Sequence, residues 1–211
     1  MKPRHVFNGY WLPPLLLALA LTPGVVEAAD VVTVPGVRFS NLTGPDGAIY
    51  NGHTEGDFTV TATAGNWFQS MFYGSTAPSI FDGPAHAPGI AVIDVTDSQG
   101  LFTLSSLDYS SNNGSSGYHI QGFLGVTSQY EETGILTGSF SPFSFRTLIT
   151  MHPTIQVDAL LIELIPGAGV TSINLDNLNV LTVPEPGGLL LLAGAFAAWV
   201  RYRGFGLTKK H

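Results

Sequence analysis

Hydrophobic and polar residues alternate over short stretches between residues 29 and 183, and no helical period persists there. Short runs of β-branched and aromatic residues are separated by clusters of Gly, Pro, Asn, Asp and Ser, which is typical of strands joined by turns. The pattern predicts strands at Val32–Phe39, Phe58–Ala64, Trp67–Tyr73, Gly89–Thr96, Leu101–Tyr109, Tyr118–Gly125, Ser128–Leu136, Phe143–Met151, Val157–Ile165 and Ser172–Leu181. About ten short strands at this spacing indicate an all-β fold, a single β-sandwich of the jelly-roll kind.

Three stretches of this region support more detailed predictions. The sequence Asp97-Ser98-Gln99-Gly100 predicts a hairpin turn, and residues 110–117, which are all Ser, Asn or Gly, predict a loop at a hairpin tip. Residues 157–165 are apolar at nearly every position apart from Asp158 and Glu163. That composition favours a central strand covered on both faces.

The first 28 residues have the three parts of a secretory signal peptide. Lys2 and Arg4 form a positive start, Leu12–Leu21 is apolar, and small residues precede a cleavage site after Ala28. We therefore expect a signal peptide at residues 1–28 and an exported domain at residues 29–182. The alternative is an N-terminal anchor that is not cleaved.

The last 29 residues combine a Pro-rich motif, an uncharged apolar run and a basic end. The motif is Val183, Pro184, Glu185 and Pro186, and Arg201 and Arg203 follow the apolar run. A helix over residues 186–202 would be about 25 Å long at about 1.5 Å per residue, so local thinning would fit it to a bilayer. Arginine side chains reach the headgroups readily, and basic residues remain on the cytoplasmic side. We predict a transmembrane helix at about 186–202 with a basic cytoplasmic tail; the alternative is an apolar helix docked on the domain.

The order of these parts resembles the bacterial PEP-CTERM sorting signal, with Pro184-Glu185-Pro186 as its motif. The resemblance implies an exosortase-like processing enzyme as a partner. It also implies a protein that is exported, anchored in the bacterial inner membrane by its C-terminal helix, and then sorted to the cell surface or an extracellular matrix. A GPI signal does not fit, because the chain ends in Lys209-Lys210-His211.

A second resemblance concerns the exported domain. Residues 53–58 (HTEGDF) and 172–178 (SINLDNL) resemble the first and last strands of exported jelly-roll domains, and residues 102–108 and 118–122 resemble inner strands of galactose-binding-like modules. This resemblance implies a jelly roll related to carbohydrate-binding modules, without specifying a sugar.

Charge and cysteine content narrow the classes of function. The chain has no cysteine, which excludes disulfides, thiol nucleophiles and Cys-based metal sites. Between residues 29 and 183 only Arg38 and Arg146 are basic, against 13 acidic residues, which gives a formal net charge of −11. Nucleic-acid binding requires basic patches, so the composition argues against it. Neutral sugars and cations remain compatible, and no cofactor is expected.

Catalytic motifs are missing from the sequence. There is no Gly-x-Ser-x-Gly elbow. Glu131 and Glu132 are adjacent, so on a strand they point to opposite faces and are not a facing glycosidase pair. His53, Glu55 and Asp57 alternate as metal ligands would, but no fourth ligand is identifiable, so no metal site is predicted.

Binding has better support. Trp67 is the one tryptophan between residues 29 and 183, and it is either a platform on which sugar rings stack or a core residue. Tyr109, Asn112, Asn113 and Tyr118 flank the predicted polar loop and are candidate glycan-binding residues; the alternative is a solvated hairpin tip.

Calcium is a further candidate ligand. Asp108 and Asp176, with Asn177, carry oxygen ligands that Ca²⁺ accepts. The alternative is that Asp176 and Asn177 satisfy the backbone at a bulge.

The sequence predicts an exported, non-catalytic protein associated with glycan or matrix. One alternative is an enzyme of the surface polymer, a glycan hydrolase or lyase. Another is a structural surface protein without a small ligand. The fold alone does not decide among them.

Overall fold

The computed structural model describes residues 36–83 and 89–183, and the predicted signal peptide and C-terminal helix lie outside these residues. The described residues form twelve strands and no helix, so they hold no helix that could cross a membrane. The strands are β1 (Gly52–Glu55), β2 (Phe58–Ala64), β3 (Trp67–Ser70), β4 (Ser79–Asp82), β5 (Ala91–Asp97), β6 (Leu101–Asn112), β7 (Ser116–Leu124), β8 (Thr127–Leu136), β9 (Gly138–Ser139), β10 (Arg146–Ile149), β11 (Ala159–Ile165) and β12 (Ser172–Val183).

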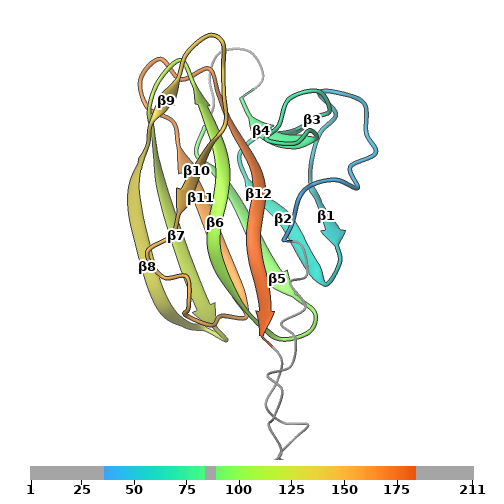
Figure 1. Cartoon of the computed structure of the whole chain (residues 1–211), viewed down its shortest axis with the longest axis vertical. Helices are drawn as coiled ribbons and strands as arrows, with labels where there is room; N and C mark the ends of the chain where they lie inside the picture. The colour runs from blue at the N-terminus through green and yellow to red at the C-terminus, as the bar shows by residue number, and fades with distance from the viewer. Residues whose placement is uncertain (1–35, 84–88, 184–211) are drawn as a thin grey trace, which may run out of the picture. The chain divides into compact units, whose positions relative to one another are not determined.

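Two sheets pack face to face, which confirms the predicted all-β sandwich (Figure 1). The first sheet has the order β1-β2-β5-β11-β7-β8. The second has the order β10-β6-β12-β4-β3, with β9 paired to β6. Apart from the short parallel β6–β9 contact, neighbouring strands are antiparallel.

The core fills the space between the sheets with apolar side chains that alternate along the strands. Phe58 of β2 meets Phe102 of β6 edge to face, with ring centroids 5.5 Å apart. In β11, Leu160, Ile162 and Leu164 are buried, as a half-covered strand requires. Burial of a large apolar side chain stabilises a fold by about 1.5–3 kcal/mol, so this layer is the main source of stability.

The prediction that residues 157–165 form a central strand covered on both faces is only partly correct. Strand β11 lies between β5 and β7, so it is central as expected. However, its buried residues alternate with half-buried ones, including Leu161 and Glu163. The strand is therefore covered fully on one face only, and its apolar outward residues lie on a partly exposed surface.

The prediction of a hairpin turn at residues 97–100 is also wrong. Strands β5 and β6 belong to different sheets, so Asp97-Ser98-Gln99-Gly100 links the two layers and is not a hairpin turn. The turn itself is local, because the backbone N–H of Gln99 donates to Asp97 Oδ1 at 2.8 Å. The other carboxylate oxygen of Asp97 accepts from Thr182 at the end of β12.

The polar stretch 110–117 is mostly strand. Strand β6 continues to Asn112 and β7 begins at Ser116, which leaves a three-residue turn. The hydroxyl groups of Ser111 and Ser116 lie 2.7 Å apart, and Ser110 donates to Asn112 Oδ1 at 2.7 Å. These side chains satisfy one another, so residues that normally favour turns are buried in the sheet.

The remaining differences between prediction and structure are strands that are missing or added. Within the described part of Val32–Phe39, only a single bridge from Val37 to Leu178 forms, and no strand. Three strands that the pattern did not predict, β1, β4 and β9, lie in their sheets beside β2, β12 and β6.

Candidate functional site

One line of side chains crosses the outer face of the second sheet. Strand register places Ile49 opposite Phe68, Phe68 opposite Phe81, Phe81 opposite Asn174, and Asn174 opposite Ser110. Residues directly opposite in antiparallel strands point to the same face. We call this line the outer row, consisting of Ile49, Phe68, Phe81, Asn174 and Ser110.

The apolar half of the outer row offers ring and alkyl surface. Ile49 is 70% exposed, and Phe68 and Phe81 are half-buried. The two phenyl rings are 5.6 Å apart at an interplanar angle of 32°. Half-buried rings held against each other are fixed in position but still accessible.

The polar half continues the row across the central strands. Asn174 donates from Nδ2 to the Ser110 carbonyl at 3.2 Å. The Tyr73 hydroxyl donates to Ser110 Oγ at 2.8 Å, and the Tyr73 ring packs on Phe145 at 4.9 Å between centroids. Aromatic side chains therefore flank a buried polar centre on both sides.

Beside the outer row, Asp176 and Asp108 face each other on β12 and β6. Asp176 Oδ2 accepts the backbone N–H groups of Ser75 and Thr76 at 2.7 and 3.3 Å, and Oδ1 accepts that of Asn177 at 2.8 Å. Burial raises the pKa of Asp176 to about 6, and the nearby Asp108 charge adds to this, while the three N–H donors oppose it. The carboxylate thus fastens the β3–β4 loop, which also carries Tyr73, to the sheet.

This arrangement does not favour calcium at Asp108 and Asp176. The Asp108 oxygens accept from Thr147 at 2.6 Å and from the Asn177 amide at 2.9 Å, and donors also occupy both Asp176 oxygens. A cation would meet N–H and O–H hydrogens where it needs free lone pairs. The structure shows the alternative role instead, because the register of β12 shifts directly after Asp176.

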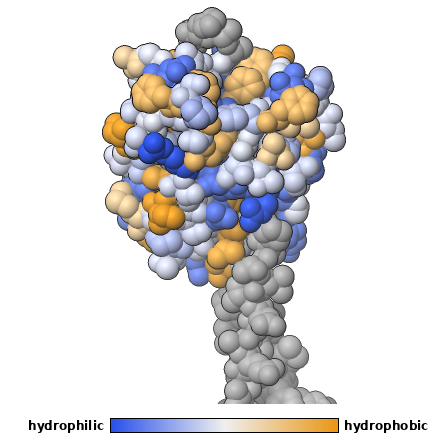
Figure 2. Space-filling view, turned by 45° about the horizontal axis from the view of Figure 1, so that its top comes forward, coloured by the Kyte–Doolittle hydropathy of each residue, from blue (hydrophilic) through white to orange (hydrophobic). Residues whose placement is uncertain are grey.

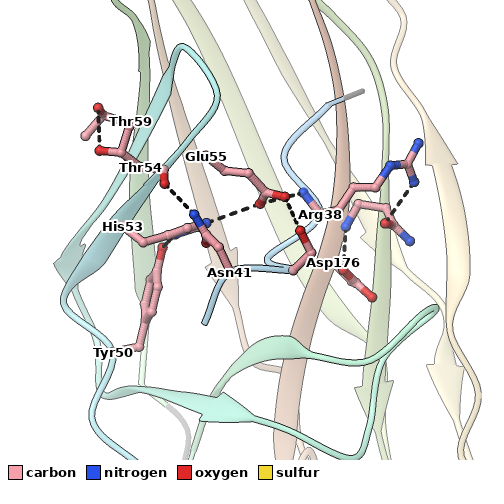
Figure 3. A network of polar contacts seen from close by, with 10 residues as sticks. Arg38, Asn41, Tyr50, His53, Thr54, Glu55, Thr59 and Asp176 are labelled. Carbon is pink, nitrogen blue, oxygen red and sulfur yellow. Dashed lines mark hydrogen bonds and ion pairs between the residues drawn. The ribbon is translucent and has the colours of Figure 1, made fainter. Parts of the chain in front are cut away.

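A polar network ties the N-terminal part of the described chain to β1 and β12 (Figure 3). Arg38 donates to Asn177 Oδ1 at 3.2 Å through its side chain and to Glu55 Oε2 at 3.0 Å through its backbone. Tyr50 and His53 Nδ1 are 2.8 Å apart, and His53 Nε2 lies 3.4 Å from Glu55. Burial lowers the pKa of His53, although the neighbouring Glu55 carboxylate opposes the shift. The network is structural, since it fixes the segment before β1.

The three alternating candidate ligands do not meet. Asp57 lies in the turn after β1 and accepts from Gln99 at 3.4 Å, away from the contact between His53 and Glu55. Among residues 36–83 and 89–183, no three His, Cys, Asp or Glu side chains are grouped as a metal site.

The structure places Trp67, Tyr109 and Tyr118 in the core, where they are 2%, 6% and 8% exposed. The Trp67 indole donates to the Ala64 carbonyl at 2.9 Å, and the Tyr118 hydroxyl to Glu132 at 2.9 Å. Burial raises the pKa of Tyr118 to about 12, with Glu132 adding to the shift. Their ring faces are taken up by core neighbours, so none of the three forms a surface platform.

The other two candidates lie at the β6–β7 turn. Asn112 is buried and donates to Ser172 at 3.0 Å, whereas Asn113 is exposed with φ 67° and donates to Thr171 at 3.0 Å. The five candidate glycan-binding residues therefore do not form one site. Sequence reasoning missed Phe68, Phe81 and Asn174; the available clue was that Phe68 must point away from the core if its neighbour Trp67 points in.

The structure confirms the prediction that Glu131 and Glu132 point to opposite faces of their strand. Glu132 is 1% exposed in the core, and Glu131 lies on the outer face. On that face His119 lies between two carboxylates, with Nδ1 3.2 Å from Glu163 and Nε2 2.9 Å from Glu131. His119 Nε2 is buried and has no partner with hydrogen-bond geometry among the described residues, although Glu131 is close to it.

A hollow of about 240 Å³ lies beside the Ile49 end of the outer row. It is bounded by residues 49–51, by the end of β2 and its turn, and by the start of β3. Ile49 and Phe68 line it and also belong to the outer row. On the face of the molecule that Figure 2 shows, hydrophobic side chains form separate groups among polar ones.

No family model matches the chain, and no curated protein matches it either. Among solved structures, it is similar to the family 32 carbohydrate-binding module of C. perfringens NanJ in complex with galactose (TM-score 0.34, 15% identity, 56% of this chain and 93% of the module). It is also similar to a family 29 carbohydrate-binding module (TM-score 0.38, 15% identity, 65% and 89% covered). A third is the family 11 module of a cellulosomal cellulase of Clostridium thermocellum (TM-score 0.36, 12% identity, 69% and 99% covered). These values are too low for any residue role to be transferred to this chain.

Proposed function

We propose that the described domain is a non-catalytic glycan-binding β-sandwich, with the apolar half of the outer row (Ile49, Phe68 and Phe81) as its contact surface. The observation that carries this proposal is the apolar half of the row, in which the half-buried Phe68 and Phe81 rings lie 5.6 Å apart beside the exposed Ile49. The weakly polar C–H face of a sugar ring packs on aromatic rings of this kind.

Charge narrows the class of glycan. The acidic composition between residues 29 and 183 repels anionic polymers. Neither phenyl ring of the row carries charge, and Asp176 beside it is buried under backbone donors. An uncharged polysaccharide is therefore the ligand class that fits.

The test is a glycan-binding screen with one matched control. Phe81→Ala removes a ring from the outer row, whereas Phe123→Ala removes a half-buried ring of β7 from the outer face of the first sheet. We expect Phe81→Ala to weaken binding about tenfold or more, equivalent to about 1.4 kcal/mol, and Phe123→Ala to have little effect. Binding that survives both Phe68→Ala and Phe81→Ala, or a parent chain that binds no glycan, would reject the proposal.

We also propose that the protein is exported and sorted through its C-terminal signal. The support is the sequence motif Pro184-Glu185-Pro186, which follows β12 directly because Val183 is the last residue of that strand. Each proline fixes φ and removes a backbone donor, which favours an extended segment open to a processing enzyme.

Sorting is tested in a host with an exosortase. Replacing Pro184-Glu185-Pro186 by three alanines should leave export intact and keep the uncut protein in the inner membrane. Arg201→Glu combined with Arg203→Glu should instead disturb anchoring or orientation. The readouts are the size and the membrane fraction of a tagged chain; release of the triple-alanine variant like the parent would show that the tail is only an anchor.

A further inference from the structure

The hollow beside the outer row has a lining suited to a small neutral ligand. None of its ten lining residues is charged. Its volume of about 240 Å³ is below the roughly 300–1,000 Å³ of pockets that enclose drug-sized molecules. That space suits one sugar ring and is too small for several.

The hollow is lined by two asparagines, Asn51 and Asn66, which come from two neighbouring segments. Asn51 and Asn66 are both exposed, and neither amide side chain has a hydrogen-bond partner among the residues described. Each amide has two N–H donors and a carbonyl acceptor. Together they offer the donor and acceptor pairs that adjacent sugar hydroxyls require.

The backbone holds these amides in place. The Asn66 N–H donates to the buried Asp82 carboxylate at 2.6 Å, and the Asn51 carbonyl accepts from Ala62 at 3.0 Å. Between them Gly65 has φ +88°, and a Cβ there would lie 2.8 Å from the Ala91 Cα. The turn is thus tightly packed and needs glycine, so the backbone that carries the two asparagines is already ordered before a ligand binds.

We infer that the hollow is a second sugar subsite, which receives a single uncharged ring at a chain end or branch. Asn51 and Asn66 hold the hydroxyls of that ring, while Ile49 and Phe68 form a wall shared with the outer row. This inference rests on the proposed function. It adds that the domain recognises a terminal or branching unit as well as the chain that crosses the sheet.

The experiment titrates the full chain with the methyl glycosides of glucose, galactose and mannose, and with linear tetrasaccharides of the same sugars. Three variants are compared: Asn51→Ala, Asn66→Ala and Phe81→Ala. Because both asparagines are exposed, the two Asn variants should keep the parent melting temperature. We expect each to weaken binding of the preferred methyl glycoside tenfold or more, and Phe81→Ala to weaken the tetrasaccharide alone.

The outcomes separate this inference from the proposed function. Tetrasaccharide binding that needs Phe81 but not Asn51 or Asn66, with no methyl glycoside bound, would overturn the subsite and leave the proposed function standing. Methyl glycoside binding unchanged in both Asn variants would also overturn it. Absence of binding by every sugar tested would reject both.

Discussion

The outer faces of the two sheets differ in how deeply their polar residues are buried. On the first sheet, buried and half-exposed residues alternate along β7 and β11, and polar side chains such as Gln121 and Glu163 reach solvent. On the second sheet, β6 is buried at ten of its twelve positions and β12 at seven of twelve, including every residue from Ile173 to Leu178. Their outward residues include Asp108, Asp176 and Asn174, all of which are hydrogen-bonded.

The difference shows that a polar residue on a strand is not necessarily at the surface. Loops cover the central strands of the second sheet, and the Asp176 carboxylate and the Ser110 hydroxyl are the groups that hold the β3–β4 loop. A buried polar group is costly unless it is paired, so these side chains act as attachment points. The apolar half of the outer row, at Ile49, Phe68 and Phe81, remains accessible where this cover ends.

The largest expected effect is on the free energy of unfolding, and it should differ between two adjacent residues, Trp67 and Phe68. Trp67 is in the core, so Trp67→Ala should lower the free energy of unfolding by roughly 3–5 kcal/mol. Phe68 is half-buried on the outer face, so Phe68→Ala should cost clearly less. Denaturant unfolding measures both, and equal costs would contradict the assignment of the two rings to opposite faces.

The next effect is the pH dependence of stability. Because burial raises the pKa of Asp176 from 3.8 to about 6, the folded chain binds a proton more readily than the unfolded chain. The stabilisation is therefore fully present below about pH 4 and is lost as pH rises through about 6. A difference of about two pKa units between the folded and unfolded chain corresponds to roughly 3 kcal/mol in the free energy of unfolding.

A matched pair of variants isolates this group. Asp176→Asn should remove most of the loss of stability between pH 4 and pH 7, as measured by urea unfolding. Burial also raises the pKa of Asp94, on the half-exposed outer face of the first sheet. Asp94→Asn should change the profile less, and the reverse order would show that Asp176 is not the buried acid described here.

A smaller effect compares two amides on the two outer faces. Asn174 is 3% exposed and donates to Ser110, so Asn174→Ala should cost about 1–2 kcal/mol by leaving a buried acceptor without its partner. Gln121 donates to Ser128 at 3.2 Å on the exposed face, and Gln121→Ala should cost less than about 0.5 kcal/mol. Thermal unfolding of both variants measures the contrast.

The smallest effect is at the His119 contact. The Glu131 side chain is 59% exposed, and exposed ion pairs contribute little. Glu131→Gln should change the free energy of unfolding by less than about 0.5 kcal/mol. A larger loss would mean that the outer face of the first sheet also depends on its polar contacts.

The sequence predicted the first sheet better than the second. Strand β2 has the predicted bounds, Phe58–Ala64, because its inward apolar residues alternate with exposed threonines. Strand β6 was predicted to end at Tyr109, because Ser110 and Asn112 favour turns in a local pattern. Their burial depends on partners distant in the chain, such as Ser172 and Tyr73.

The outer row was not predictable for a related reason. Phe68 and Phe81 are adjacent only because β3 and β4 pair, and Asn174 joins them through β12. Strand order and register determine this neighbourhood, and neither follows from alternation within one strand. Candidate residues such as Trp67 were selected by residue type, and residue type alone does not distinguish a core ring from a surface ring.

Strand β12 has a mechanical consequence. It pairs with β6 from Ser172 to Val183 and with β4 on its other side, and it ends where the proposed sorting motif begins. Hydrogen bonds in an antiparallel ladder are perpendicular to the strands, so tension applied beyond Val183 loads them in shear. Bonds loaded in shear must break together, whereas bonds at a peeled edge break one by one. If the domain is held at the end of β12, a pulling force would therefore act on the β6–β12 ladder, which has the most paired residues of any strand pair in the described part of the chain.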